Sequence, residues 1–209
     1  THVMKHAWKD LKLRRNVSNQ LLFKQSNMIN YQNNKPFVEG VAIEVIASSH
    51  TTPMYVYSQK KIEEKYNKLK NTLNAEIFYA VKANSNQAII KLMSTVGAGA
   101  DVVSVGELER AITAGINPKK IIFEGIGKSK DDISFAISNN IRLINVESID
   151  EIQRINNVAQ VHNKCIDIGI RLNPNIDGQT IDKISTGKKT DKFGIDTEKL
   201  QDIFQSLEN

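Results

Sequence analysis

The sequence predicts a parallel α/β fold over most of its length, because the same strand-then-helix pattern recurs along it. Short runs rich in β-branched residues appear from residue 77 onward, and a helical pattern follows each of the first four. The runs cover residues 77–81, 100–103, 121–123, 141–146 and 166–172, so their starts lie 23, 21, 20 and 25 residues apart. Repeats of this size, with strands that are apolar throughout, are typical of a doubly wound sheet or a (β/α)8 barrel.

The helices between these runs carry start signals as well as apolar periodicity. Three serines stand three residues before an acid, as in the capping box, where each side chain satisfies a free backbone N–H. The pairs are Ser104 with Glu107, Ser148 with Glu151 and, less closely, Ser129 with Asp132. Gly115 is placed to end one helix. A further helix, residues 60–73, precedes the series.

The number of repeats bears on the choice between the two folds. A barrel needs eight strands and five are visible, so a barrel would lack about three, whereas a five-stranded open sheet would be complete. The first strand, however, is followed by Lys82-Ala83-Asn84 and not by a glycine-rich dinucleotide loop. This weakens the interpretation as a nucleotide-binding open sheet.

Composition indicates a globular chain that can bury its own core, with 209 residues of which 40% are hydrophobic. The one cysteine, Cys165, cannot form an intrachain disulfide, and no run approaches the roughly 18 apolar residues of a membrane span. We therefore expect a cytoplasmic protein with no membrane partner. Cys165 opens the fifth run, away from the strand ends where chemistry occurs, so we expect a buried structural thiol.

The positive charge lies almost entirely in residues 1–35, which hold seven bases and one acid. The remaining residues 36–209 keep 21 of the 28 bases and 22 of the 23 acids, a net charge of −1. This leaves no basic face for a phosphate backbone, so we expect no nucleic-acid partner. Residues 1–35 are interpreted as a disordered basic extension in preference to a targeting segment.

Polar residues at the carboxyl ends of the predicted strands are the candidates for a site, because those ends meet at one edge of a parallel fold. They are Lys82, then Asp101 and Ser104, Glu124 with residues 125–128, Asn145 and Glu147, and finally Arg171 and Asn173. Partial burial of a lysine lowers the pKa of its ammonium and yields an amine that attacks aldehydes. Position alone, however, favours an ordinary solvated lysine.

The residues around these positions resemble the fold-type III pyridoxal-phosphate decarboxylases. The lysine motif of that family is matched by residues 78–84, Phe-Tyr-Ala-Val-Lys-Ala-Asn, and four more blocks follow in the family's order. These blocks are Ala100-Asp101-Val102-Val103-Ser104 with Gly106-Glu107-Leu108, residues 125–129, residues 144–148 and residues 170–174. Residues 184–187, Ile-Ser-Thr-Gly, and 192–195, Lys-Phe-Gly-Ile, resemble the diaminopimelate decarboxylases more than the ornithine or arginine enzymes.

The resemblance implies a partial (β/α)8 barrel, about five of eight units, of the alanine-racemase and ornithine-decarboxylase type. It implies a cofactor-binding barrel over residues 59–209, preceded at 36–58 by a short segment of the family's β domain. It also implies pyridoxal phosphate as cofactor, decarboxylation of meso-diaminopimelate to lysine, and a homodimer that acts on a small amino acid. Two alternatives stay open, a non-catalytic or degenerate fragment of the same fold and a decarboxylase of ornithine or arginine. Alanine racemase lacks support, because its motif after the lysine differs from Asn84-Ser85-Asn86.

The resemblance also implies the roles of the site residues. Lys82 would bind the cofactor covalently and manage protons, with Asp101 and Arg171 flanking it and Glu107 bracing this polar group. For Glu107, a capping role alone is the alternative. No metal is expected, because His2, His6, His50 and His162 show no ligand spacing with carboxylates or the cysteine.

Two departures from the family pattern accompany the match. Many members have His-Pro-Tyr where this chain has Ile181-Asp182-Lys183. The family's ring-stacking histidine, glycine-rich phosphate loop, acid facing the pyridine nitrogen and catalytic cysteine would all lie beyond Asn209. The two short glycine pairs, at 97–99 and 125–127, are interpreted as turns and not as phosphate cradles.

Overall fold

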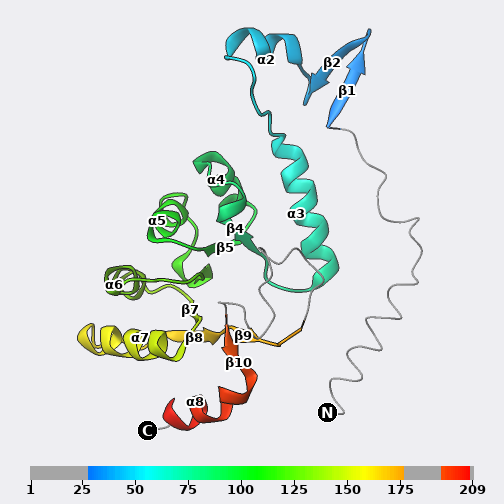
Figure 1. Ribbon diagram of the computed structural model, residues 1–209. Coiled ribbons are helices and arrows are strands. Elements are labelled where there is room, and N and C mark those ends of the chain that lie inside the picture. The colour runs from blue at the N-terminus through cyan, green and yellow to red at the C-terminus, as the bar shows by residue number, and fades with distance from the viewer. Residues whose placement is uncertain (1–27, 177–193, 208–209) are drawn as a thin grey trace. The chain divides into compact units, whose positions relative to one another are not determined.

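A computed structural model describes residues 28–176 and 194–207 of the chain (Figure 1), and these fall into two compact units that meet between Lys65 and Tyr66. Several positions singled out in the sequence lie outside the described residues. They are His2, His6, Ile181-Asp182-Lys183, the Ile-Ser-Thr-Gly segment at 184–187, and Lys192 with Phe193. The two units are described separately.

The first unit contains a small antiparallel sheet of strands β1 (Ile29–Gln32), β2 (Lys35–Val38) and β3 (Val41–Ala42), then helix α2 (Ile43–Ser49). Asn33 and Asn34, with φ of 50° and 60°, form the turn between β1 and β2. Strand β1 lies inside the predicted disordered extension, so that prediction is wrong for residues 29–32. The strand escaped notice because its residues are mostly polar and exposed, and its pairing depends on the asparagine turn.

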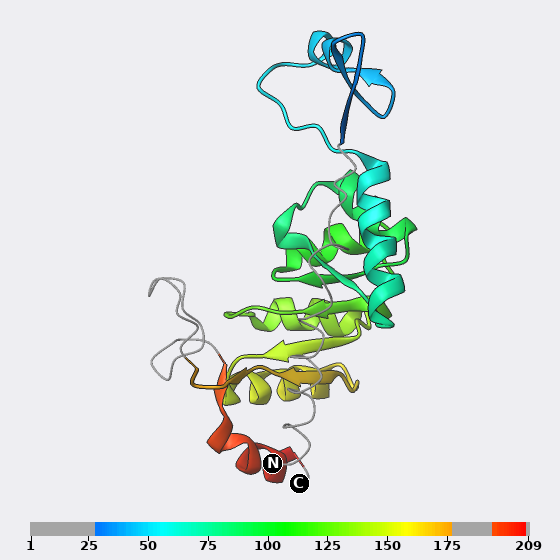
Figure 2. The ribbon, with the colours of Figure 1, turned by 90° about the vertical axis from the view of Figure 1, so that its right-hand side faces the viewer.

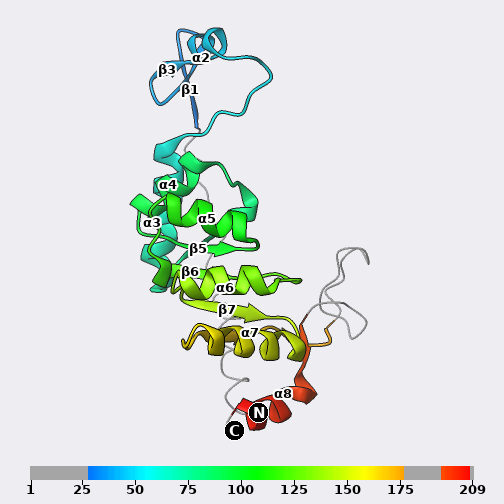
Figure 3. The same ribbon diagram turned by 90° about the vertical axis from the view of Figure 1, so that its left-hand side faces the viewer.

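Helix α3 (Gln59–Leu73), predicted at 60–73, spans the boundary between the units, and the second unit is built on a parallel sheet. Its strands lie in the order β4 (Phe78–Ala80), β5 (Gly99–Val102), β6 (Ile121–Phe123), β7 (Leu143–Val146) and β8 (Asp167–Ile170). The connecting helices are α4 (Gln87–Thr95), α5 (Val105–Thr113), α6 (Lys130–Ser138) and α7 (Ile149–Val161). Figure 3 shows these four helices stacked side by side on one face of the sheet.

This topology decides between the two folds that the repeats allowed. Strand order follows chain order without reversal, and every connecting helix lies on the same face (Figures 2 and 3). A doubly wound sheet has helices on both faces and a point at which the strand order reverses. The described residues therefore form an arc of a (β/α)8 barrel, as the resemblance implied.

Alternation along the strands separates a buried core from an open face. The side chains that point toward the helices are almost completely buried, and include Ala100, Val102, Ile121, Phe123, Ile144 and Val146. In the parallel register, Asp101 aligns with Ile122 and Asn145 aligns with Gly169, between these buried positions. Asp101 and Asn145 therefore lie on the face of the sheet that the helices leave open.

Helix caps follow the predicted serines, with a difference at two of them. At α6 the full capping box forms, because Ser129 Oγ accepts the N–H of Asp132 and an Asp132 oxygen accepts the N–H of Ser129. At α5 Ser104 accepts the N–H of Glu107, but Glu107 accepts the N–H of Val103. The prediction of a reciprocal box is wrong at Ser104 and also at Ser148, where Glu151 accepts the N–H of Glu147. A glutamate is one methylene longer than an aspartate and in both helices reaches one residue further back.

The fifth predicted strand divides at Arg171. Strand β8 ends at Ile170, and β9 (Leu172–Asn173) pairs instead with β10 (Ile195–Asp196), after which come the 3-10 turn η4 (Thr197–Lys199) and helix α8 (Leu200–Leu207). The backbone of Arg171 joins the two ladders, since its N–H donates to Val146 O at 3.0 Å and its carbonyl accepts from Ile195 N at 2.7 Å.

Cys165 lies in the loop before β8 and is exposed. The prediction of a buried structural thiol is wrong, because the strand starts at Asp167 and leaves Cys165 in the surface turn that follows α7. Within residues 28–176 and 194–207, no helix combines the length and apolar character needed to cross a membrane.

Gly99 allows β4 and β5 to pack closely, and this generates a prediction. A Cβ built on Gly99 would lie 2.5 Å from Phe78 Cδ1 and 2.6 Å from Lys120 O in the 3-10 turn η2 (Pro118–Lys120). We expect Gly99→Ala to lower the free energy of unfolding by about 1–3 kcal/mol in urea titrations. Gly106→Ala is the control, because the nearest atom to its Cβ is 4.0 Å away, and the added methyl in helix α5 stabilises by up to about 1 kcal/mol. Equal effects of the two changes would contradict the assignment of strain to Gly99.

Candidate functional site

Lys82 lies at the carboxyl end of β4, in the 3-10 turn η1 (Val81–Ala83). Val81 is completely buried in the core while Lys82 is exposed, as its position at a strand end favoured. The turn explains the difference, since it rotates the lysine out of the strand's alternation. The loop after it is held by Tyr79, whose hydroxyl donates to Asn84 O at 2.9 Å. Lys82 therefore presents an accessible amine on an anchored backbone.

Asp101 lies close enough to Lys82 for their charges to interact. Its Oδ1 is buried and has no hydrogen-bond partner among the described residues. Burial, and then the negative charges of Glu124 and Glu107, raise the pKa of the Asp101 carboxyl, while the positive charge of Lys82 opposes that shift. Three other candidate residues therefore lie near Asp101, namely Lys82, Glu107 and Glu124.

Glu107 also caps helix α5, since its Oε2 accepts the N–H of Val103 at 2.9 Å. The two interpretations of this residue are compatible, because the capping bond fixes the carboxylate at the end of β5, where its charge acts on Asp101. Its role toward a cofactor stays a prediction.

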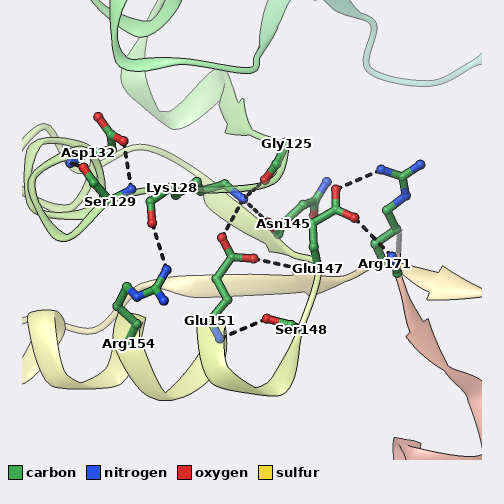
Figure 4. A network of polar contacts seen from close by, with 11 residues as sticks. Gly125, Lys128, Ser129, Asp132, Asn145, Glu147, Ser148, Glu151, Arg154 and Arg171 are labelled. Atoms are coloured by element: carbon green, nitrogen blue, oxygen red, sulfur yellow. Dashed lines mark hydrogen bonds and ion pairs between the residues drawn. The ribbon is translucent and has the colours of Figure 1, made fainter. Parts of the chain in front are cut away.

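Arg171 belongs to a second group at the same edge of the sheet. It follows β8, the opposite edge strand from β4, and its Nη1 donates to Glu147 Oε1 at 2.8 Å. Glu147 is only 8% exposed, and its Oε2 accepts the N–H of Gly194 at 3.2 Å. Figure 4 shows the carboxylate of Glu147 directed toward the guanidinium of Arg171. Arg171 thus lies in the Glu147 group, four strands along the sheet from Lys82.

Lys128 was a strand-end candidate in the sequence, within residues 125–128, but no role was assigned to it. It is 3% exposed, and its Nζ donates to Gly125 O at 2.5 Å, Asn145 O at 2.7 Å and Glu151 Oε1 at 3.1 Å (Figure 4). Gly125 and Gly127, with φ of 94° and 76°, turn the loop back toward the sheet as the sequence predicted. The sequence signal for Lys128 is its place at a strand end, directly after a glycine pair.

Asn145 links the two groups. Its Nδ2 donates to Glu124 Oε1 at 2.6 Å, and its carbonyl accepts from Lys128. The side chain lies over Gly169 of β8, where a Cβ would overlap Asn145 Oδ1. The strand ends therefore carry a connected polar network from Asp101 and Glu124 across Asn145 and Lys128 toward Arg171.

A pocket of about 480 Å³ opens beside Glu147. It is lined by Glu147, Ser148, Ile149, Asp150, Asn173, Asn175, Gly194, Ile195, Asp196 and Lys199, and Lys82 is not among these residues. The pocket is thus adjacent to the Arg171 group. Among residues 28–176 and 194–207, no three His, Cys, Asp or Glu side chains come together in a way that could hold a metal ion.

Comparison with known proteins gives concordant results. Residues 59–209 match the family model described as "Pyridoxal-dependent decarboxylase, pyridoxal binding domain". The chain is 38% identical to the diaminopimelate decarboxylase of Aquifex aeolicus over 194 residues, which is 91% of this chain and 46% of that protein. It is 43% identical to the diaminopimelate decarboxylase of Neisseria meningitidis serogroup B over 162 residues, 76% of this chain and 39% of that protein.

A solved structure agrees with these relatives. The crystal structure of diaminopimelate decarboxylase from Helicobacter pylori complexed with L-lysine matches with a TM-score of 0.76 and 40% identity, covering 80% of this chain and 43% of that one. The chain spans less than half the length of each of these proteins.

The unpartnered oxygen of Asp101 predicts an unusual pH dependence of stability. A carboxyl whose pKa is raised by folding binds its proton more tightly in the folded state, so its contribution to stability falls as pH rises from the ordinary value of 3.8 through the raised value. Asp101→Asn removes this titration. We expect the apoprotein variant to gain stability over the original chain as pH rises above 4, measured by urea unfolding between pH 4 and 8. Asp131→Asn, on an exposed side chain, should show no such gain, and a pH-independent difference for Asp101→Asn would contradict the prediction.

Proposed function

The chain belongs to the pyridoxal-dependent decarboxylase family, and on that premise we propose that its protein decarboxylates meso-diaminopimelate to lysine with pyridoxal phosphate bound at Lys82. The observation that carries the proposal is the accessible amine of Lys82 beside the buried, unpartnered Asp101 oxygen, within the segment that matches the family's cofactor-binding domain. Identities of 38–43% to diaminopimelate decarboxylases support the substrate.

The residues at the strand ends fit the cofactor. An aldehyde requires a reachable amine, and Lys82 is exposed. The buried Oδ1 of Asp101 leaves an acceptor for a donor that the described residues do not supply, and the side chain of Arg171, which binds Glu147, is 37% exposed. When bound, pyridoxal phosphate accepts the electrons that remain as CO2 departs.

The chain's own residues would orient groups and move protons. Lys82 Nζ would hold the cofactor through its aldehyde carbon, and its ammonium form would deliver a proton to the carbon that has lost CO2. The carboxyl of Asp101 lies near that amine, and the charges of Glu124 and Glu107 act on Asp101 in turn. Arg171 would lie on the opposite side of the site, with its orientation fixed by Glu147.

The substrate proposal gains support from the ligand of one relative. The Helicobacter pylori structure is complexed with L-lysine, which is the product expected from meso-diaminopimelate. The homodimer and the cytoplasmic location implied by the resemblance stay predictions. The distinction from ornithine and arginine enzymes rests on residues 184–187 and 192–193, outside the described residues, and on the overall identities.

Reductive trapping tests the cofactor lysine. We expect borohydride treatment of the full-length gene product with pyridoxal phosphate to attach the reduced cofactor to Lys82, as seen by peptide mass spectrometry. Lys82→Ala should abolish the labelled peptide, and Lys91→Ala, on an exposed lysine of helix α4, should leave it unchanged. Labelling spread evenly over exposed lysines would contradict the assignment.

Substrate selectivity tests the reaction. We expect the full-length gene product to release CO2 from meso-diaminopimelate at a kcat/KM at least about 100-fold above that for ornithine or arginine, because a site built for a second carboxylate leaves polar groups unpaired with substrates that lack one. The measurement is CO2 release with lysine quantified as product. Preferential turnover of ornithine or arginine would support the related-decarboxylase alternative, and labelling of Lys82 without turnover of any of the three would support a degenerate enzyme.

A further inference from the structure

We propose that Lys128 is a positioning residue of this site, which acts through Glu151 and Asn145 to fix the carboxyl ends of β6 and β7 and so orients Glu147 toward Arg171. The catalytic part of this inference, that Lys128 positions groups for the reaction, rests on the proposed function. Its structural content, the orientation of Arg171, does not require that function.

The burial of Lys128 is the first step of the argument. An ammonium that is 3% exposed is costly unless it is paired and hydrogen-bonded. Its three protons match three acceptors, Gly125 O, Asn145 O and Glu151 Oε1. The aromatic ring of Phe123 covers it from another side, with its centroid 5.5 Å from Nζ. The ammonium of Lys128 therefore uses all three of its donors, whereas Lys82 is exposed.

The first arm of the network runs from Lys128 to Arg171. Glu151 accepts from Lys128 with Oε1 and from the backbone N–H of Glu147 with Oε2, at 2.8 Å. Ser148 caps the same helix by accepting the N–H of Glu151. The backbone of Glu147 is thus fixed at the junction of β7 and α7, and its carboxylate then binds Arg171 Nη1 and the N–H of Gly194.

The second arm runs from Lys128 toward Lys82. The carbonyl of Asn145 accepts from Lys128, and its side chain donates to Glu124 Oε1 at 2.6 Å. Glu124 in turn acts electrostatically on Asp101, which faces Lys82. Lys128 is therefore the point at which the Lys82 group and the Arg171 group are joined, and Figure 4 shows its bonds to Gly125, Asn145 and Glu151.

Stability alone does not account for this arrangement. A buried ion pair is often no more stabilising than apolar residues of similar volume. Stability therefore does not require a lysine at this buried position in the loop between β6 and α6. What apolar residues cannot supply is a set of directed bonds to two strand-end carbonyls and one carboxylate. All three acceptors lie on the segments that carry Glu124 and Glu147, which points to orientation as the role.

The test compares Lys128→Met with Ile137→Ala, a change in the buried face of α6 that touches none of these bonds. The readout is the rate of phenylglyoxal modification of Arg171 in protein without cofactor, followed by peptide mass spectrometry. Arg142, paired with Glu76 at the other end of the sheet, is the internal reference. Without its bond to Lys128, Glu151 no longer fixes the backbone of Glu147, and the charge-assisted bond from Glu147 to Arg171 weakens. We therefore expect Arg171 in Lys128→Met to react at least about threefold faster than in Ile137→Ala. Equal rates would overturn the inference.

A second variant covers the case in which the single change leaves Glu151 as an unpaired buried charge and the protein does not fold. Lys128→Met with Glu151→Leu replaces the pair by apolar groups, and should show the same acceleration at Arg171. A rate at Arg171 equal to that of Ile137→Ala would overturn the inference here too.

Cofactor affinity separates this inference from the proposed function. In the full-length gene product we expect Lys128→Met to bind pyridoxal phosphate roughly 3- to 30-fold more weakly than Ile137→Ala, the range seen for changes along coupled networks. If the unmodified protein does not bind pyridoxal phosphate at Lys82, the proposed function fails while the Arg171 rates still decide the inference. If it binds and the two variants have equal affinity, the positioning role fails and the proposed function stands.

Discussion

The two-residue alternation of the parallel strands is the constraint on which the rest of this structure depends. In β5, β6 and β7 the side chains toward the helices are fully buried and close-packed, so their identities are limited to apolar residues. Every polar strand residue must then point to the other face, as Asp101 and Asn145 do. Because all five strands run parallel and all four helices lie on one side, those polar groups collect at one edge of one face. The site follows from the packing of the core on its other side.

Local sequence patterns were sufficient for the elements but not for their exact ends. The β-branched runs located all five strands and the serines located the starts of α5, α6 and α7, because burial and capping act within a few residues. The fifth strand was drawn through Arg171, whose backbone instead bonds to both Val146 and Ile195. That division depends on a partner 24 residues further along the chain, which periodicity cannot register.

The role of a site residue was predicted where the residue acts through its own position, and it was missed where the residue acts through a partner. Lys82 and Asp101 were identified because each stands at a strand end and matches a family block. Lys128 and Glu151 have roles that exist only when β6, β7 and α7 are adjacent, since the bond between them joins residues 23 apart. In the sequence Glu151 was explained as a cap, and Lys128 was a strand-end candidate without an assigned role, so nothing local pointed to a buried pair.

The balance of charge across the strand ends indicates which kind of ligand the site favours. Glu151 is matched by Lys128 and Glu147 by Arg171, each through a direct ion pair. On the Lys82 side, burial and then the negative charges of Glu124 and Glu107 raise the pKa of Asp101, while the charge of Lys82 lowers it. A surplus of negative charge costs stability in the empty site, and it is relieved by a bound group that carries positive charge. A protonated ring nitrogen or the ammonium of an amino acid would supply that charge, whereas an uncharged ligand would not.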